Sequence, residues 1–435
     1  MSILTFSAGE TTTDVTSVAV IGLGYIGLPT AAILASQGLR VTGVDINPAT
    51  VEAVNDGRVP FVEPDLGVHV AGAVSQGTLR AQTEVPVADA YIVAVPTPFK
   101  GDKSADLTYV EQAARNIAPR LRAGNLVILE STSPPGTTKH LAEVILAERP
   151  DLGAESNGGK AAVLFAHCPE RVLPGRIMIE LVTNDRIIGG LTPEGANAAA
   201  ALYKTFCQGG IHLTDATTAE MAKLVENAYR DVNIAFANEL SMISESLDIN
   251  VWNLIELANH HPRVNILQPG PGVGGHCIAV DPWFIVAADP ERSRLIRTAR
   301  EVNDSKPDYV VSAIESAAAS LEQPVIAALG LAFKANVDDT RESPAVDIVH
   351  RIATGNPQAR IVVGSPFTGT GLPEKLANLP NVALGTAEEA LEKADVVALL
   401  VDHDAFREIT SEQLEGKRIV DTRGFWQGKN NATPE

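Results

Sequence analysis

One cysteine, Cys277, stands in the glycine- and proline-rich stretch QPGPGVGGHCIAVDPWF, which covers residues 268–284. Glycines in such a stretch let the backbone take positive φ angles or approach a ligand closely. A cysteine that does no chemistry is usually buried as a small apolar residue, and a loop of this composition buries a side chain poorly. The residue types suggest a reactive thiol followed, four residues later, by the carboxylate of Asp281. The alternative is a tight turn that contains a cysteine by chance.

A second stretch, VTSVAVIGLGYIGLPTAAILASQGLRVTGVDIN, is spaced for binding a dinucleotide. A β-branched run leads into three glycines, an Ala- and Leu-rich helical stretch follows, and a second strand ends at an aspartate 18 residues after the last glycine. The first glycine permits the turn, the second lets a pyrophosphate approach the helix N-terminus, and the third allows close packing. The aspartate can accept both ribose hydroxyls and would repel a 2′-phosphate, so NAD is expected rather than NADP. The residues expected to contact this cofactor are Gly22, Gly24, Tyr25, Ile26, Gly27 and Asp45.

Further polar residues follow predicted strands. Thr97 follows the predicted strand in DAYIVAVPTPF, and Thr132 follows the one in NLVILESTSPPGTT. Glu170 and Arg171 follow the predicted strand in AVLFAHCPERVLPG. In an open parallel sheet the ligand cleft lies beyond the carboxyl ends of the strands, so these four side chains are expected to point toward it. Taken singly, each threonine is equally well explained as a helix cap or a turn residue.

A long helix is predicted between Asp215 and Leu247, because this segment contains neither Pro nor Gly. Thr214 or Asp215 is the expected N-cap. Lys223, Asn227 and Arg230 recur at i, i+4 and i+7 and therefore form one stripe of the helix. Such a stripe is usually a solvated face. Here the other faces are apolar, which favours a stripe that lines a cleft.

The rest of the chain completes an α/β protein. Short apolar strands in PVIAALGLAFKANVDDTRESP, ARIVVGSPF, ADVVALLVDHDAF and KRIVDTRGFW alternate with helical segments. The predicted fold is two doubly wound Rossmann-like domains joined by a central helical segment with one long helix. The expected domains are 1–209 for NAD binding, 210–316 for a helical domain that contributes to catalysis and dimerisation, and 317–435 for a C-terminal α/β domain.

Composition excludes several classes of function. The chain has 435 residues and a formal net charge of −19, so nucleic acid and anionic membranes are not expected partners. Three cysteines far apart argue against a disulfide framework and for a reducing compartment. No signal peptide and no apolar run of membrane-spanning length is visible. We therefore expect a cytoplasmic protein, and no metal-ligand spacing is evident, so no metal is expected.

Six motifs occur together in order across nearly the whole chain: VIGLGYIGLPTA, VPTPF, CPERVLPG, EMAKLVENAYRDVNIAFANEL, PGPGVGGHC and GLAFKANVDDTRESPA. In this combination the chain resembles the UDP-glucose/GDP-mannose dehydrogenase family, whose members oxidise the primary alcohol of a nucleotide sugar to an acid in two NAD-dependent steps. HPRVNILQPGPGVGGHCIAVDPWFIV and VPTPFKGD are most similar to the branch that oxidises UDP-N-acetyl-D-mannosamine for surface polysaccharides. A UDP-sugar is therefore the expected substrate.

The resemblance explains why the loop carries a thiol. Oxidation beyond the aldehyde needs an adduct that can release a second hydride, and a thiolate supplies one as a thiohemiacetal. Cys277 matches the family's nucleophile, and Lys223 matches its proton donor and acceptor and oxyanion stabiliser. Asn227 is expected beside Lys223, with Asp281 and Glu170 as carboxylates that orient Lys223 or a water molecule.

The resemblance also implies the residues that hold the ligands. Arg341 is expected to reach NAD from the C-terminal domain. Independently of the resemblance, a homodimer is expected around the long helix, because a helix longer than one domain needs has apolar surface to cover. "SPPGTT" departs from the family's usual "SPVGST", but Thr132 is retained. Arg423 matches a position that also accepts Lys. The expected substrate-binding residues are Arg171, Val172, Lys223, Asn227, Arg230, His261, Arg263, Gly274, Phe333, Lys334 and Arg423.

Three alternatives remain open. UDP-N-acetylglucosamine or UDP-glucose could replace UDP-N-acetyl-D-mannosamine, since the two N-acetylated sugars differ only at carbon 2. A two-electron dehydrogenase of the 2-hydroxyacid or phosphogluconate type would share a Rossmann domain and a helical lysine. That reading leaves Cys277 and the C-terminal domain without a task. A protein that binds NAD or a UDP-sugar without catalysis would not need Lys223, Asn227 and Cys277 together.

Overall fold

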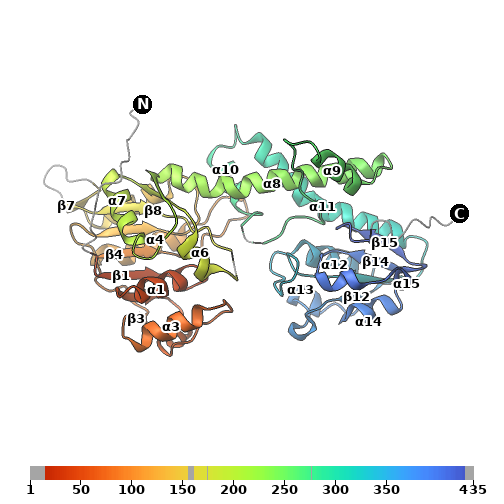
Figure 1. Ribbon diagram of the computed structural model, residues 1–435, viewed down its shortest axis with the longest axis horizontal. Coiled ribbons are helices and arrows are strands. Elements are labelled where there is room, and N and C mark those ends of the chain that lie inside the picture. Colours follow the sequence, from red (N-terminus) through yellow and green to blue (C-terminus); the bar gives the residue numbers. More distant parts are fainter. Residues whose placement is uncertain (1–14, 155–160, 174, 276, 427–435) are drawn as a thin grey trace. The chain divides into compact units, whose positions relative to one another are not determined.

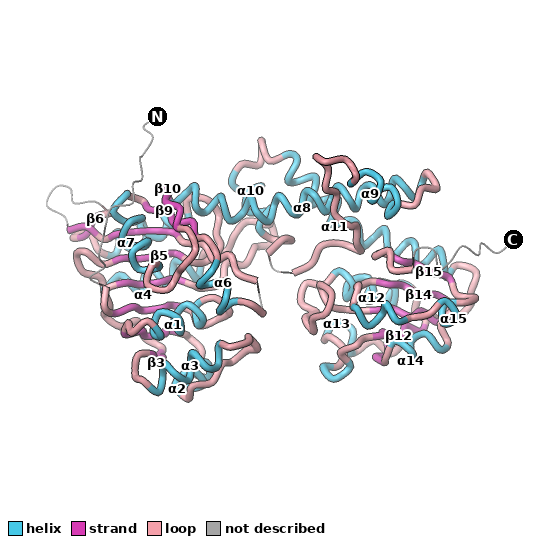
Figure 2. The backbone as a smooth tube through the Cα atoms, viewed as in Figure 1, coloured by secondary structure: helices cyan, strands magenta, loops and turns pink. Residues whose placement is uncertain are grey.

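A computed structural model of the protein describes residues 15–154, 161–173, 175–275 and 277–426 (Figures 1 and 2). The chain divides into two compact units, Met1–Glu226 and Asn227–Glu435. Each unit contains one open sheet with helices on both faces, and the predicted pair of doubly wound α/β domains is thereby confirmed. The division into two units falls inside a helix, so the three predicted domains (1–209, 210–316 and 317–435) remain a prediction.

The first unit is built on an eight-stranded sheet. Its strands, in spatial order, are β10 (Ile211–Asp215), β9 (Arg186–Gly190), β8 (Leu164–His167), β5 (Leu126–Leu129), β4 (Ala90–Val93), β1 (Ser17–Ile21), β2 (Arg40–Val44) and β3 (Leu79–Gln82). Neighbouring strands are parallel except for β8 and β9, which pair antiparallel over two residues.

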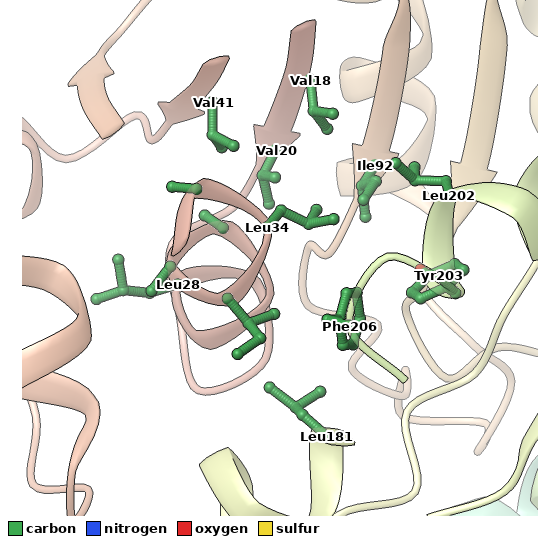
Figure 3. Packing of buried hydrophobic residues seen from close by; sticks show 14 of the residues in the cluster. Val18, Val20, Leu28, Leu34, Val41, Ile92, Leu181, Leu202, Tyr203 and Phe206 are labelled. Carbon is green, nitrogen blue, oxygen red and sulfur yellow. The ribbon is translucent and has the colours of Figure 1, made fainter. Parts of the chain in front are cut away.

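Alternation along the central strands explains the two faces of this sheet. Val18 and Val20 of β1 pack into one core cluster, and Ala19 and Ile21 pack into the other, because successive strand residues point to opposite faces. Figure 3 shows part of the first cluster, in which Leu34 of α1 lies near Val20 of β1. Helices on this face are α1 (Gly27–Ser36), α2 (Pro48–Asn55), α3 (Leu66–Ser75), α6 (Ile177–Thr183) and α7 (Pro193–Tyr203). The opposite face is covered by α4 (Thr108–Ile117), the 3₁₀ helix η1 (Ala118–Arg120) and α5 (Thr137–Glu148), and β6 (Leu152–Gly153) pairs with β7 (Ala161–Ala162).

The second unit contains a five-stranded parallel sheet. The strands, in spatial order, are β13 (Val382–Gly385), β12 (Arg360–Gly364), β11 (Val325–Leu329), β14 (Val396–Leu399) and β15 (Arg418–Asp421). One face packs on α11 (Arg294–Ala318), α12 (Pro344–Gly355) and α13 (Glu374–Ala377). The other face packs on α14 (Ala387–Glu392), η3 (Asp404–Glu408) and α15 (Ser411–Leu414), and η2 (Thr368–Thr370) follows β12.

The predicted long helix is α8 (Ala216–Ser246), which begins in the first unit and continues into the second. It begins at Ala216 because the Asp215 carboxylate accepts hydrogen bonds from the backbone N–H and the hydroxyl of Thr218, which makes Asp215 the N-cap. It ends before Asp248, whose φ of +54° lies in the left-handed region. The second unit then continues with α9 (Val251–Asn259) and α10 (Asp281–Ala288).

Both sheets have a point at which the direction of winding reverses. In the first unit it lies between β1 and β4, and in the second it lies between β11 and β14. Ligands of open α/β sheets bind beyond the carboxyl ends of the strands at such a point. Among the described helices, none combines the length and the apolar character that crossing a membrane requires.

Candidate active site and cofactor site

The glycine turn after β1 has the geometry that a dinucleotide needs. Gly22 has φ of +93°, and a Cβ atom on it would lie 2.5 Å from the carbonyl oxygen of Ala94. A Cβ atom on Gly27 would lie 1.9 Å from the carbonyl oxygen of Gly22, so only glycine lets α1 pack this closely on the strand. A Cβ atom on Gly24 would meet nothing within 4 Å, so the backbone there is open to an approaching pyrophosphate.

Asp45 directly follows β2, and its side chain binds the backbone of the glycine turn. One oxygen of its carboxylate accepts the backbone N–H of Leu23 and the other accepts that of Asn47, each at 2.9 Å. A carboxylate has about four lone-pair sites, so two remain for the hydroxyls of a ribose. Tyr25 stacks on Phe61 with ring centroids 4.3 Å apart, and Ile26 is the N-cap residue of α1. The residues present therefore fit NAD.

Thr97 and Thr132 follow the neighbouring strands β4 and β5, and the structure brings them together. The hydroxyl of Thr97 donates to the backbone carbonyl of Thr132 at 2.5 Å. The hydroxyl of Ser131 donates to the carbonyl of Val95 at 2.7 Å and ties the same two strand ends. Both threonines therefore lie beyond the carboxyl ends of β4 and β5, next to the point between β1 and β4 at which the winding reverses.

Glu170 lies just beyond β8 and is 7% exposed. One of its oxygens accepts the backbone N–H of Arg171 at 2.6 Å, and the other lies 3.4 Å from the guanidinium of the buried Arg186. Burial, and after it repulsion from Glu170, raises the pKa of nearby Glu130 to about 8. These contacts suit a carboxylate that fixes the end of β8, and the catalytic role of Glu170 remains a prediction.

Arg171 is held by acidic and carbonyl groups of its own unit. Its guanidinium pairs with Glu226 at 2.6 Å and donates to the carbonyl of Asp185 at 3.0 Å. A hollow of about 370 Å³ opens beside it and is within the size range of small-molecule sites. The residues that line it are Arg171, Asp185, Ile187, His212, Leu213, Thr214, Thr218 and Ala222. Val172 follows Arg171 and packs against the first core cluster.

Lys223 is positioned through the first turns of α8. One turn before it, the buried carboxylate of Glu220 accepts the backbone N–H groups of Gly136 and Thr138, which lie at the start of α5. The hydroxyl of Thr138 donates to the same carboxylate at 2.6 Å. Burial raises the pKa of Glu220, and these three donors oppose that shift. The helix that carries Lys223 is thus anchored to the Rossmann sheet of the first unit.

Cys277 lies in the second unit, in an exposed turn that leads directly into α10. Its carbonyl oxygen accepts the backbone N–H of Asp281 at 2.9 Å, so the thiol precedes the helix by one turn. Asp281 is the first residue of α10 and is 3% exposed. The side-chain amide of Asn227 donates to its carboxylate at 2.6 Å. The structure therefore joins two predicted catalytic residues, Asn227 and Asp281, beside the cysteine turn.

The glycines before Cys277 pack on the C-terminal domain of their own unit. A Cβ atom on Gly274 would lie 2.4 Å from the carbonyl oxygen of Glu342 and 3.3 Å from the Phe333 side chain. The N–H of Gly275 donates to the same carbonyl, and its φ is +84°. These glycines thus serve close packing, in addition to the approach to a diphosphate that the sequence suggested. Gly274 and Phe333, both predicted to bind substrate, lie together.

The predicted arginines of this unit are also held by acids. The guanidinium of Arg423 donates to Asp402, and a Cβ atom on Gly270 would lie 2.5 Å from it. Arg341 makes a two-pronged pair with Asp339. The Lys334 ammonium lies 5.7 Å from the centre of the Phe333 ring. The remaining predicted substrate residues, Arg230, His261 and Arg263, are exposed, and their place in a site stays a prediction.

Sequence reasoning missed a buried polar network between α8 and α11. Its members are Asp231, Asn238, Arg300 and Asn303, each no more than 1% exposed. Arg300 and Asn303 both donate to the carboxylate of Asp231. Burial raises the pKa of Asp231, and the charge of Arg300 opposes that shift. A signal was present in the sequence, since Asp231 and Asn238 stand four and eleven residues after Asn227 and so share its face of the helix.

Comparison with known proteins finds relatives over nearly the whole length of the chain. Sequence models of the UDP-glucose/GDP-mannose dehydrogenase family match residues 16–207 (NAD binding domain), 217–305 (central domain) and 327–428 (UDP binding domain). The NDP-N-acetyl-D-galactosaminuronic acid dehydrogenase of Ralstonia nicotianae is 56% identical, over 96% of this chain and 98% of that protein. The UDP-N-acetyl-D-mannosamine dehydrogenase of Escherichia coli is 54% identical, over 94% and 99%.

Solved structures give the same result. The UDP-D-ManNAc dehydrogenase of Pyrococcus horikoshii is 39% identical with a TM-score of 0.82, covering 94% of this chain and 96% of that one. A UDP-N-acetyl-mannosamine dehydrogenase of Staphylococcus aureus is 41% identical with a TM-score of 0.81, covering 96% of both chains. With its NAD-binding turn and these full-length matches, the chain belongs to the UDP-glucose/GDP-mannose dehydrogenase family and is an NAD-dependent UDP-sugar dehydrogenase.

Proposed function

We propose that the protein oxidises UDP-N-acetyl-D-mannosamine at carbon 6 to UDP-N-acetyl-D-mannosaminuronate, consuming two NAD, for surface polysaccharide synthesis. The observation that carries the proposal is the exposed Cys277 one turn before the buried, Asn227-bound Asp281. A two-electron dehydrogenase would have no use for such a thiol. Relatives with the proposed activity in their names are 54% identical over nearly the whole chain.

The chain's own residues divide the chemistry between them. NAD, when bound at the turn after β1, accepts the hydride released in each oxidation. Lys223 takes the proton of the substrate alcohol and stabilises the oxyanion that develops on its oxygen. The thiolate of Cys277 then adds to the aldehyde carbon, and loss of the second hydride from this thiohemiacetal leaves a thioester. Water breaks the carbon–sulfur bond, releases the acid and returns the thiol, while Asn227 and Asp281 orient the oxyanion or the water.

A local basic surface would hold the substrate on this acidic protein. Arg171 and Arg423 are proposed to contact the UDP-sugar, with Phe333 and Lys334 at the uridine nucleotide, and Arg341 is proposed to reach NAD. Each arginine already pairs with a carboxylate of its own unit: Glu226, Asp402 and Asp339. These pairs hold the guanidinium groups in place before the ligand arrives. Glu170 is proposed to support the site through Arg186.

The identity of the sugar is the finer part of the proposal. UDP-N-acetylglucosamine and UDP-glucose differ little from the proposed substrate, and the 56% identical relative is named for an N-acetylgalactosaminuronic acid. An N-acetylated sugar of the galacto configuration is therefore the second candidate. The test is the NADH released per sugar, compared across the UDP-linked forms of N-acetylmannosamine, N-acetylglucosamine, N-acetylgalactosamine and glucose. The proposal requires two NADH and an acid from the first, and the largest kcat/KM for that sugar.

A homodimer and a cytoplasmic location complete the proposal. Tyr229, Phe236 and Ile243 of α8 are 71%, 51% and 48% exposed and recur every seven residues, and Leu247, directly after the helix, is 61% exposed. Apolar residues at this spacing form one stripe, and large exposed apolar stripes are usually covered by a partner. A second copy of the same helix would cover it in a two-fold arrangement. Three widely separated cysteines suit a reducing compartment.

A further inference from the structure

The loop that carries Cys277 is attached to α8 at two points. At one end the Asn227 side-chain amide donates to Asp281 at 2.6 Å. At the other end the backbone N–H of Gly270 donates to the side-chain oxygen of Asn238 at 2.9 Å. Asn227 and Asn238 are eleven residues apart on one helix, which is about three turns, so they face the same side.

The helix and the loop between the two attachment points each cover eleven residues, but they differ in how far those residues can reach. Eleven residues of α-helix rise about 16 Å, whereas the eleven residues from Gly270 to Asp281 could extend over more than about 35 Å. The loop therefore has about twice the chain it needs, and two fixed ends alone would leave it free to adopt many shapes. Its turns at Gly272 and Gly275, with φ of +142° and +84°, take up the surplus against Phe333 and Pro344.

The attachment at Asn238 is enforced by a chain of hydrogen bonds that can run in one direction only. The backbone N–H of Gly270 can only donate, so the side-chain oxygen of Asn238 must accept it. The side-chain nitrogen of Asn238 then faces Asn303 and donates to its side-chain oxygen at 2.8 Å. Asn303 in turn donates to the carboxylate of Asp231 at 2.7 Å, and Arg300 donates to the same oxygen. Each amide orientation is fixed by its neighbours.

This network is poorly explained as a source of stability. Within the described part of the chain, one oxygen of Asp231 and Nε of Arg300 are buried without a hydrogen-bond partner. Buried ion pairs seldom stabilise a fold more than apolar residues of similar volume, and unsatisfied buried groups cost free energy. A function in positioning accounts for the network better than packing does.

We propose that Asn238, held by Asn303 and Asp231, is a positioning residue that sets the place of Cys277 for the second oxidation. The inference rests on the proposed function, because it requires the thiol to act on the aldehyde. A displacement of about 1 Å can reduce the rate of a chemical step about 10²-fold. The first oxidation does not use the thiol, so loss of the Gly270 attachment should slow the second step selectively.

The test compares two variants with one control. Asn238→Ala removes the acceptor for Gly270, whereas Asn238→Asp retains it but sets an oxygen against the Asn303 oxygen in a buried place. Ser241→Ala is the matched control, because Ser241 accepts a hydrogen bond from Lys306 between the same two helices and donates to the backbone carbonyl of Asn238, not to the side chain that holds Gly270. Single-turnover reactions with excess enzyme, analysed by mass, give the ratio of acid to aldehyde, and thermal unfolding gives stability.

Asn238→Ala should slow the second oxidation at least about tenfold relative to the first. Aldehyde, bound or free, should therefore accumulate at the expense of acid. Asn238→Asp should lose as much thermal stability or more, yet keep the wild-type ratio, and Ser241→Ala should keep that ratio too. Hydrogen exchange of the peptide that contains Gly270 should accelerate in Asn238→Ala alone. The proposal is overturned if the ratio follows stability across the three variants, or if Asn238→Ala keeps the wild-type ratio. A wild-type enzyme that forms no acid would refute the proposed function instead, and the exchange result would still test the attachment.

Discussion

Asp45→Ala should weaken the binding of NAD without unfolding the protein. In the structure each carboxylate oxygen already accepts one backbone N–H, and the remaining lone pairs are those available to a ribose. Hydrogen bonds to a charged group are worth about 1.5–3 kcal/mol each, so losing even one of the two to the ribose raises the Kd of NAD about 10- to 150-fold. Removal of the negative charge also removes the repulsion of a 2′-phosphate, so the preference for NAD over NADP should narrow.

The assay is equilibrium titration of NAD and NADP without sugar, which separates cofactor binding from catalysis. Asn47→Ala is the matched control, because Asn47 caps α2 two residues further on with its side-chain oxygen. That variant should lose about 1 kcal/mol of stability and keep the wild-type Kd for NAD. A folded Asp45→Ala protein with unchanged affinity for NAD and an unchanged NAD/NADP preference would refute the assignment of Asp45 to the ribose.

Three further predictions concern stability and assembly. Gly274→Ala should destabilise the protein by about 1–3 kcal/mol in denaturant unfolding, since its Cβ would strike the Glu342 carbonyl, whereas Gly72→Ala, with open space around it, should not. The pKa of Glu130 is about 8 in the folded protein, against about 4.5 in the unfolded chain. The folded state therefore holds this proton more tightly, and the stability that Glu130 contributes falls as pH rises from 4.5 to 8. Unfolding at pH 5 and pH 8 should therefore show Glu130→Gln gaining stability relative to wild type at the higher pH, and a constant difference would count against a raised pKa of Glu130 in the folded state. Phe236→Glu should convert a dimer into a monomer in light scattering at micromolar concentration, and a wild-type protein that is already a fully active monomer would rule out the dimer.

The sequence was sufficient to predict the parts of the site that are local in the chain. The turn at Gly22, Gly24 and Gly27 and the carboxylate of Asp45 follow from one strand–turn–helix unit, whose spacing is imposed by the cofactor. The helix from Ala216 to Ser246 follows from the absence of Pro and Gly. Both are short-range consequences of residue type, which a single sequence contains.

Contacts between distant residues could not be predicted in the same way. The bond from Asn227 to Asp281 joins residues 54 apart, and the bond from Gly270 to Asn238 joins residues 32 apart. The bond from Asn238 to Asn303 depends on how α8 packs against α11. No spacing rule indicates such partners, because they arise from packing. The same holds for Arg171, Arg341 and Arg423. The sequence shows their charge, but it does not show which carboxylate pairs with each one.

The central claim is that Cys277 carries the second oxidation as a covalent adduct, and one measurement tests it most directly. Wild-type enzyme and Cys277→Ala, each in excess over UDP-N-acetyl-D-mannosamine, are followed through a single turnover by NADH absorbance and product mass. Wild type should release two NADH per sugar and form the acid. Cys277→Ala should stop after at most one NADH, with the aldehyde held on the enzyme, because the first hydride transfer needs no sulfur. If Cys277→Ala forms the acid at a rate near that of wild type, the thiol takes no part and the covalent mechanism is wrong.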